Sequence, residues 1–285
     1  MILKRKIYKK LLEWKNECQG KKALLIEGAR RIGKSTICEE FGKNEYESYL
    51  LIDFAKKDKE VERYFERYLN DLDTFFMLLQ THFGTKLTER NSLIIFDEVQ
   101  MFPQARAAIK YLVADGRYDY IETGSLISIR ENVKNIVIPS EERNINMYPL
   151  DFEEFAIALE EDLLVEYIKK CFEKREPLER SMHNQAMLLF HQYMLVGGMP
   201  MPVVSFIENK KDFTEADKEK RDILKLYRED IMKIDAKYRS KVLAIYDQIP
   251  GFLSQHEKRV VFKKLQDGSY ADQYEETFFW LSDSM

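Results

Sequence analysis

The segment "IEGARRIGKSTICEEF", residues 26–41, constrains the fold more than any other part of this sequence. It fits the pattern G-x-x-x-x-G-K-[ST], with Gly28, Gly33, Lys34 and Ser35 at the fixed positions. The apolar run before it, "KALLIEG", is typical of a strand buried on both faces, and "KSTICEEF" after the second glycine is typical of a helix. The sequence therefore predicts a buried strand, a tight loop and a helix in direct succession, which is the context that a phosphate-binding loop requires.

Each residue type in this loop has a physical reason. Glycines allow positive φ and let backbone N–H groups approach a phosphate, while the start of the following helix contributes the positive end of its dipole. Lys34 is expected to place its charge on the β- and γ-phosphates, and Ser35 to offer its hydroxyl to Mg²⁺. The predicted nucleotide-binding residues are Gly28, Ala29, Arg30, Arg31, Ile32, Gly33, Lys34, Ser35 and Thr36.

A second part of the candidate site is "SLIIFDEVQ", where an apolar run precedes two acids. Asp97, at the end of this predicted buried strand, is suited to the metal side of a nucleotide site, and Glu98 is suited to polarise an attacking water. The alternative is that both acids simply begin a solvated loop. The upstream phosphate loop favours the functional interpretation, in which Ser35 and Asp97 hold the metal.

Two further positions carry alternatives. Thr123, Gly124 and Ser125 in "IETGSL" end a predicted strand, and they suit either hydrogen bonding to the γ-phosphate or capping of a following helix. Arg143 lies on a predicted loop near the end of the sheet region, where it is either a solvated cation or an arginine finger, in cis or from a neighbouring subunit. The candidate catalytic set is Glu98, Lys34, Ser125 and Arg143.

The order of elements predicts the fold class. Further buried strands are predicted at "SYLLIDF", "SLIIFDEV" and "YDYIETGS", with the helical stretch "KDKEVERYFERYLNDLDTFFMLLQTHFG" and the proline-initiated helix "PQARAAIKYLVAD" between them. Alternating strands and helices indicate an α/β fold, a parallel sheet with helices on both faces. From about Asp151 onwards the strand signals fade and helices follow, with a break at "GGMPMPVV" and a surface loop at "ENKKDFTEADKEK".

Composition limits the class of protein. The 285 residues are 45% hydrophobic, and 45 basic residues against 49 acidic ones exclude an overall cationic field that would attract nucleic acid. Three widely spaced cysteines argue against a disulfide framework or a zinc knuckle, and no stretch has the length of a membrane span. We therefore expect a soluble cytoplasmic protein. Ile7, Leu11 and Trp14 recur at helical spacing and predict an amphipathic N-terminal helix that packs on the core.

Six segments together resemble one known family. "GARRIGKST", "LIIFDEVQ", "ETGS", "MYPLDFEEF", "LVGGMP" and "LYREDIMKI" occur in the order and approximate spacing of a bacterial and archaeal family of predicted AAA-type ATPases. In that family an ATPase domain precedes a domain of unknown function of the DUF4143 type. By this resemblance, Lys34 and Ser35 are the Walker A pair, Asp97 and Glu98 the Walker B pair, and Ser125 a sensor-like residue, with Arg143 where members carry an arginine.

The resemblance also implies a domain order. It predicts an AAA-like P-loop domain with its N-terminal helix over residues 1–155, a helical region over 156–235 and a winged-helix-like unit over 236–285. Family members usually continue into a part that resembles a restriction-endonuclease fold, whereas this sequence stops at "FFWLSDSM". Either the C-terminus is shortened, which would leave the winged-helix-like unit incomplete, or this member packs its terminus differently. A nuclease-like role is not supported by this sequence.

The leading functional hypothesis is Mg²⁺-dependent hydrolysis of ATP, with Glu98 as the base and with Lys34 and Mg²⁺ carrying the developing charge. The preference for ATP over GTP comes from the family resemblance. One alternative is a slow nucleotide switch that recruits DNA or a protein partner through the C-terminal region, and another is a P-loop kinase. Lys258, Arg259, Lys263 and Lys264 suit DNA or a merely solvated helix face. An oligomer is compatible with the sequence, and no membrane partner is expected.

Overall fold

The structure is a computed structural model that describes residues 1–124, 141–232, 236–255, 274 and 277–278. The chain divides into two compact units, residues 1–216 and 217–285. Ser125, Lys258, Arg259, Lys263 and Lys264 lie outside the described residues. Within the described part of the chain, no helix is long and apolar enough to cross a bilayer.

The first unit contains a five-stranded sheet in the order β2-β3-β4-β1-β5, and every neighbouring pair is parallel. The strands are β1 (Ala23–Glu27), β2 (Ser48–Asp53), β3 (Ser92–Asp97), β4 (Asp119–Gly124) and β5 (Glu142–Asn146). The predicted parallel α/β sheet is confirmed. The edge strand β5 was not predicted, because its sequence "ERNIN" is polar and only half-buried and so lacks the apolar signal of a central strand.

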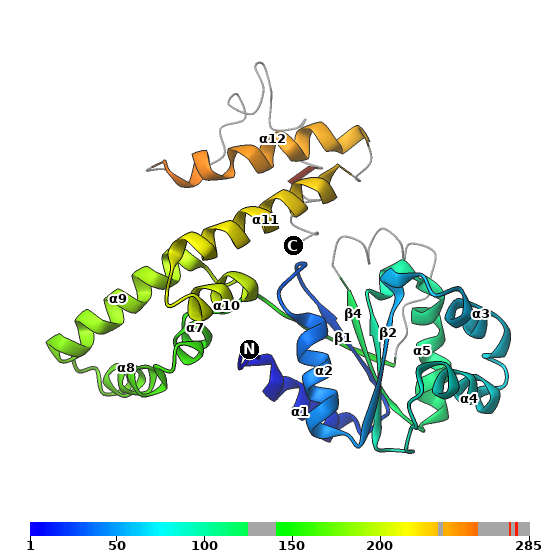
Figure 1. Ribbon diagram of the computed structural model, residues 1–285. Coiled ribbons are helices and arrows are strands. Elements are labelled where there is room, and N and C mark those ends of the chain that lie inside the picture. The colour runs from blue at the N-terminus through cyan, green and yellow to red at the C-terminus, as the bar shows by residue number, and fades with distance from the viewer. Residues whose placement is uncertain (125–140, 233–235, 256–273, 275–276, 279–285) are drawn as a thin grey trace. The chain divides into compact units, whose positions relative to one another are not determined.

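Helices cover both faces of this sheet (Figure 1). Helices α1 (Ile7–Cys18) and α2 (Lys34–Glu45) pack on one face around Leu11, Trp14 and Phe41. Helices α3 (Lys59–Tyr68), α4 (Leu72–Phe83) and α5 (Pro103–Asp115) pack on the other face, and the short 3-10 turns Phe54–Lys56 and Val99–Met101 follow β2 and β3. The long predicted helical stretch is two helices, because the side chain of Asp71 caps α4 by accepting from the Thr74 N–H.

A helical region with its own core completes the first unit. It consists of α7 (Phe152–Ala158), α8 (Asp162–Lys174), α9 (Arg180–Val196) and α10 (Pro200–Glu208). Phe155 and Phe206 are fully buried at its centre. The predicted break at "GGMPMPVV" separates α9 from α10, and α10 begins inside that segment at Pro200. The expected surface loop is shorter than predicted, because α11 (Phe213–Ile231) begins inside it. Proline is favoured at the first helical position, which explains the start of α10.

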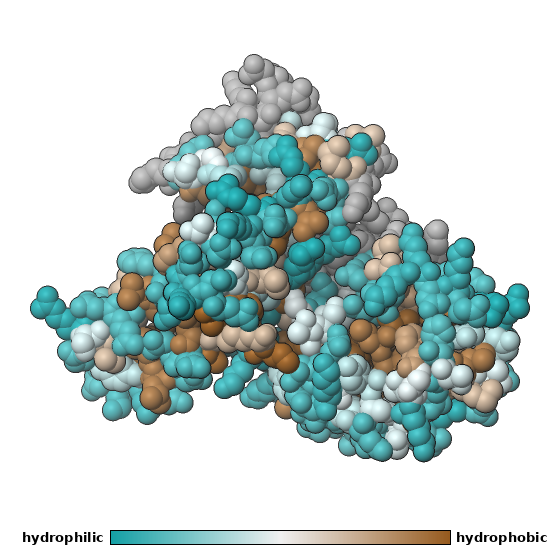
Figure 2. Space-filling model, viewed as in Figure 1, coloured by the Kyte–Doolittle hydropathy of each residue, from teal (hydrophilic) through white to brown (hydrophobic). Residues whose placement is uncertain are grey.

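Large apolar side chains are exposed over this helical region (Figure 2). Leu163 is 81% exposed and Phe172 on α8 is 84% exposed. On α9 the exposed apolar residues are Met187, Leu188, Phe190, Met194 and Leu195. The sheet, in contrast, keeps nearly all of its large apolar side chains inside two cores.

The second unit, residues 217–285, is described for α12 (Ala236–Leu253) and for most of α11, which begins before the boundary. Ile231 and Val242 form a small buried cluster with Tyr238 and Tyr246 against it. The Tyr246 hydroxyl donates to Leu224 O across 3.1 Å. The winged-helix-like unit falls largely outside the described residues, and the domain boundaries at 155 and 235 stay predictions.

Candidate functional site

The phosphate loop joins β1 to α2, and its two glycines are required by its geometry. Gly28 has φ 154°, and a Cβ there would lie 2.3 Å from the Met147 carbonyl oxygen, closer than any side chain tolerates. Gly33 has φ 92° and immediately precedes the first helical residue, Lys34. Arg31 also adopts positive φ, at 64°, although it is not glycine. This backbone is the tight, positive-φ loop that the sequence pattern predicts.

Lys34 lies inside the curve of the loop. Its side chain is buried, and its Nζ donates to Gly28 O at 3.0 Å and to Ala29 O at 2.8 Å. Burial lowers the pKa of this ammonium, and the nearby carboxylates of Glu98 and Asp97 oppose that shift. A phosphate in the loop would provide the negative charge that a buried ammonium favours.

The register of the sheet brings three oxygen-bearing side chains together. Ser35 Oγ donates to Asp97 Oδ1 at 2.8 Å, and the Thr123 hydroxyl donates to the same carboxylate oxygen. Phe96 pairs with Glu122 and Ile26 pairs with Thr123, so Asp97 at the end of β3 faces Thr123 on β4, beside β1. Parallel strands end at one edge of a sheet, which is where α/β proteins bind ligands.

Thr123 is the polar residue of "IETGSL" that lies in the described site, whereas Ser125 was the predicted one. Thr123 is fully buried and contacts Asp97 directly. The sequence offered both residues at the end of a strand, and only the strand register distinguishes them. The predicted role of Ser125 stays a prediction.

Glu98 follows Asp97 and leaves the strand with a left-handed backbone, at φ 52°. Its N–H donates to Thr123 Oγ1 at 3.3 Å, and Gln100 Nε2 donates to its carboxylate. Gln100 is buried. Glu98 is therefore held through both its backbone and its side chain. Its carboxylate is near enough to Lys34 to raise the pKa of that lysine.

The oxygen donors fit Mg²⁺. Magnesium prefers hard oxygen ligands and is usually held by one or two protein groups together with substrate phosphates and waters. The Ser35 hydroxyl and the Asp97 carboxylate provide such a pair, 2.8 Å apart. Within the described residues no group of three or more His, Cys, Asp or Glu side chains is placed to hold a metal by itself. Ser35 and Asp97 would therefore hold the ion jointly with a nucleotide.

Arg143 is not brought to this site. It lies on β5 rather than on a loop, opposite Leu24 of β1, at the end of the strands away from the phosphate loop. Gly28 lies four positions after Leu24, which is ~13 Å along the strand. The Arg143 guanidinium instead donates to Glu17 of α1 at 2.8 Å on the surface. This placement does not fit an arginine finger acting on the site of its own chain.

A pocket opens beside the phosphate loop. Its volume is about 120 Å³, and apolar side chains provide most of its wall. For scale, a cavity of about 150 Å³ holds a benzene ring. The lining comes from residues 1–5, from the loop and first turn of α2, and from α10: Met1, Ile2, Leu3, Arg5, Gly33, Thr36, Ile37, Pro200, Met201 and Val204.

The segments "MYPL", residues 147–150, and "GGMP", residues 197–200, also meet beside this loop. Met147 N donates to Glu27 O at 2.8 Å, just before the loop begins. Leu150 N donates to Gly198 O at 2.7 Å, and a Cβ at Gly198 would lie 2.1 Å from Leu150 O. These contacts use backbone atoms, so no side-chain pattern in the sequence could have revealed them.

The parallel sheet, the loop after β1 and the acid after β3 define a P-loop NTPase fold. Residues 20–156 match the family model described as an AAA domain (AAA_14), which supports an AAA-type domain in this segment. Residues 187–285 match a model described as a domain of unknown function (DUF8612). The expected DUF4143-type domain is therefore not confirmed, because the C-terminal match is to a different domain.

No curated protein matches the chain. Solved structures that resemble it include C. elegans PCH-2, at 11% identity and TM-score 0.40, covering 77% of this chain and 69% of that one. Domain III of the Thermotoga maritima replication initiation protein DnaA has 13% identity, TM-score 0.39 and coverages of 73% and 87%. AMPPCP-bound DnaA from Aquifex aeolicus has 10% identity, TM-score 0.39 and coverages of 99% and 90%. These similarities are too distant to contribute to a functional argument.

Proposed function

We propose that this protein binds ATP with Mg²⁺ and hydrolyses it to ADP and phosphate. The observation that carries the proposal is the junction of Ser35, Asp97 and Thr123 beneath the phosphate loop, with Glu98 held directly beside it. These residues come from three different elements of the sheet domain. The match of residues 20–156 to an AAA domain supports the same chemistry.

The roles follow from position and charge. Lys34, buried inside the loop, stabilises negative charge that develops on the β- and γ-phosphates. Bound Mg²⁺ would neutralise phosphate charge, and Ser35 and Asp97 are the residues that would hold it. Glu98 orients and polarises the attacking water, and Gln100 fixes the direction of its carboxylate. Thr123 orients Asp97 by a hydrogen bond to the carboxylate.

The pocket beside the loop is placed to receive part of the base. It adjoins Gly33 and the first turn of α2, so a ligand with phosphates in the loop would extend its base toward Ile37, Pro200 and Val204. Its apolar wall suits the face of a purine ring. Competition between ATP and GTP would test the base preference, for which the family resemblance favours ATP.

The experiment compares nucleotide binding and phosphate release for the wild type, Lys34→Ala and Glu98→Gln, with Mg²⁺ present. Lys43→Ala, on the exposed last turn of the same helix, and Glu66→Gln, on the surface of α3, serve as matched controls. We expect Lys34→Ala to lose nucleotide affinity. Glu98→Gln is expected to bind normally and to release phosphate on the order of 100-fold more slowly. Both controls should behave as wild type.

Other outcomes have distinct meanings. A wild type that binds nucleotide with no turnover would replace the ATPase proposal with the slow switch, and a search for a DNA or protein partner would follow. Turnover that survives Glu98→Gln would remove Glu98 as the base. If the wild type binds no nucleotide, the proposal is wrong.

A further inference from the structure

Arg5 joins the phosphate loop to the first helix of the helical region. Its Nη1 donates to Ile32 O at 2.8 Å, its Nη2 donates to Tyr148 O at 2.5 Å, and its Nε donates to Glu154 Oε1 at 3.2 Å. The side chains of Arg5 and Glu154 are only 6% and 7% exposed. One guanidinium thus contacts the loop, the "MYPL" segment and α7 together.

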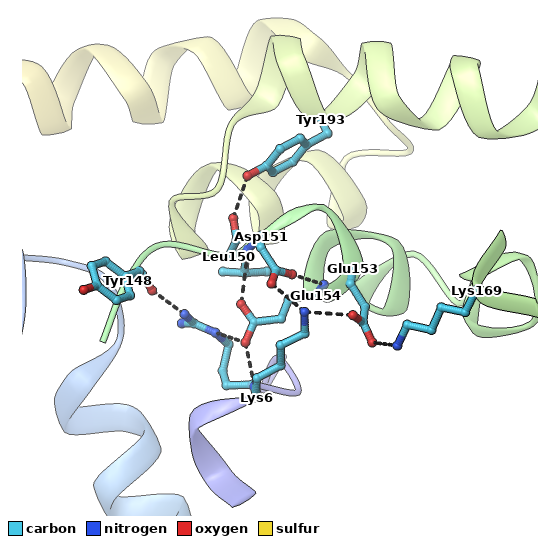
Figure 3. Close-up of polar contacts among 9 residues, drawn as sticks. Lys6, Tyr148, Leu150, Asp151, Glu153, Glu154, Lys169 and Tyr193 are labelled. Atoms are coloured by element: carbon cyan, nitrogen blue, oxygen red, sulfur yellow. Dashed lines mark hydrogen bonds and ion pairs between the residues drawn. The ribbon is translucent and has the colours of Figure 1, made fainter. Parts of the chain in front are cut away.

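The neighbourhood holds this guanidinium in place. Glu154 also accepts from the Lys6 N–H at 2.6 Å and from the Asp151 N–H at 3.2 Å, and it completes a capping box at the start of α7. Lys6 Nζ lies between Asp151 and Glu153 (Figure 3). A planar guanidinium that makes three hydrogen bonds in a partly buried site has little freedom to move.

The contact of Arg5 with Ile32 O determines the direction of the Gly33 N–H, which would donate a hydrogen bond to phosphate. Ile32 C=O and Gly33 N–H belong to one trans peptide plane, in which the carbonyl and the N–H point in opposite directions. Arg5 holds the carbonyl end from outside the loop, and its Nη1 lies 3.9 Å from a Cβ position at Gly33. The Gly33 N–H is therefore directed away from Arg5, toward the interior of the loop where phosphate oxygens would lie.

We propose that Arg5 is a positioning residue for phosphate binding, which acts by fixing the Ile32–Gly33 peptide. This inference rests on the proposed nucleotide binding. Glycine has no Cβ to resist a peptide flip, so a loop with glycine at this position needs an external restraint if its N–H is to stay directed at phosphate. Arg5 provides that restraint and links it to Glu154, so the order of α7 and the affinity of the loop are coupled.

The test measures affinity for ATP, ADP and inorganic tripolyphosphate in the wild type, Arg5→Ala, Arg5→Lys and Lys6→Ala. Lys6→Ala is the matched control, because it removes contacts to the same helix without touching the loop. We expect Arg5→Ala to weaken all three ligands by about tenfold or more, the usual effect of losing a charge-assisted hydrogen bond. Steady-state turnover is measured in parallel, and the loss in Arg5→Ala should appear more in KM than in kcat, because Arg5 contacts the backbone of the loop and not Glu98. Arg5→Lys should recover part of the affinity.

Tripolyphosphate separates this role from an effect on the base, since Arg5 also lines the pocket. A loss seen with ATP and ADP and absent with tripolyphosphate would overturn the proposal, because Arg5 would then act through the base. Wild-type affinity in Arg5→Ala would also overturn it. If Arg5→Ala does not fold, Arg5→Lys decides: wild-type affinity contradicts the proposal and intermediate affinity supports it. A wild type that binds none of the ligands would disprove the proposed function itself.

Discussion

The phosphate site and the helical region organise their residues by different means. At the site, Asp97 and Thr123 are placed by parallel strands whose register sets each side chain to within one position, and Ser35 is placed by the first turn of α2. In the helical region, Leu163 and Phe172 face solvent, and the contacts that join it to the loop run through backbone carbonyls. Motif residues mark where chemistry can occur, whereas Arg5, which contacts the loop from outside the motif, belongs to no motif of its own.

The largest expected change in unfolding free energy comes from the difference in side-chain burial between the sheet domain and the helical region. Phe96 is 1% exposed and contacts the rings of Phe54, Phe65 and Tyr120, so Phe96→Ala should cost about 3–5 kcal/mol of unfolding free energy. Phe172→Ala, at a side chain 84% exposed, should change stability by less than about 0.5 kcal/mol. Urea unfolding of both variants measures this. A large cost at Phe172 would mean that its face is covered in solution, and the contrast would fail.

The second effect concerns the close approach of Gly198 to Leu150. Gly198→Ala places a Cβ 2.1 Å from Leu150 O, and we expect it to cost about 1–3 kcal/mol and also to weaken nucleotide binding by displacing the segment next to the loop. Gly84→Ala is the control, because its Cβ would meet no atom within 4 Å, and it should cost about 1 kcal/mol through its positive φ alone. Thermal unfolding and nucleotide titration distinguish the two. Equal affinities in both variants would show that the helical region does not support the loop.

The third effect is a pH dependence of the unfolding free energy that comes from Glu122, a buried residue of β4. Glu122 is fully buried, neither oxygen has a hydrogen-bond partner when ionised, and burial, with a hydrogen bond to Glu142, raises its pKa well above the ordinary value of 4.5. The folded protein therefore keeps this proton above pH 4.5, where the unfolded chain releases it. The stability that results is fully present below pH 4.5 and is lost as the pH rises through the folded pKa.

Glu122→Gln should remove this decline, because glutamine cannot ionise and keeps a donor for Glu142. Unfolding free energies measured from pH 4.5 to alkaline pH should fall in the wild type by more than in Glu122→Gln. The surface variant Glu66→Gln should follow the wild type. Parallel curves for wild type and Glu122→Gln would show that Glu122 is ionised in the folded state.

The smallest effect concerns Arg143. Because its guanidinium pairs with Glu17 on the surface, away from the loop, Arg143→Ala should leave stability and nucleotide affinity unchanged. Turnover by the isolated chain should also be unchanged. A fall in turnover that depends on protein concentration would instead indicate that Arg143 acts on a neighbouring subunit, the remaining form of the arginine-finger hypothesis.

Much of the fold and the core of the site could be predicted from sequence. Strands β1 to β4, the loop after β1 and the pairing of Ser35 with Asp97 follow from apolar runs that end in a recognisable pattern. Edge strand β5 could not be predicted, because a polar half-buried strand has no apolar signal. Neither could the division of the long helical stretch at Asp71, where a short capping contact interrupts otherwise continuous helical periodicity.

The residues around the site were harder to assign. Thr123 and Ser125 were equivalent candidates in the sequence, and the pairing of β3 with β4 alone places Thr123 on Asp97. Arg143 was a candidate because an arginine can stabilise charge on a transferred phosphate. Its position on β5 instead places it at the end of the strands away from the phosphate loop. Arg5 gave no signal, since its partners are two main-chain carbonyls and one carboxylate more than 20 residues away. The contact of Gly198 with Leu150 gave none either, since it is made by main-chain atoms.

The sequence by itself determined the elements and the chemistry of the loop, because apolar periodicity, glycine conformation and the charge of Lys34 are local properties of the residues. Tertiary structure alone decided which oxygen meets Asp97, where Arg143 lies and what restrains the Ile32–Gly33 peptide. Those outcomes depend on strand register and on close approach of backbone between distant segments. These contacts join residues that are far apart in the sequence, so a local sequence pattern does not reveal them.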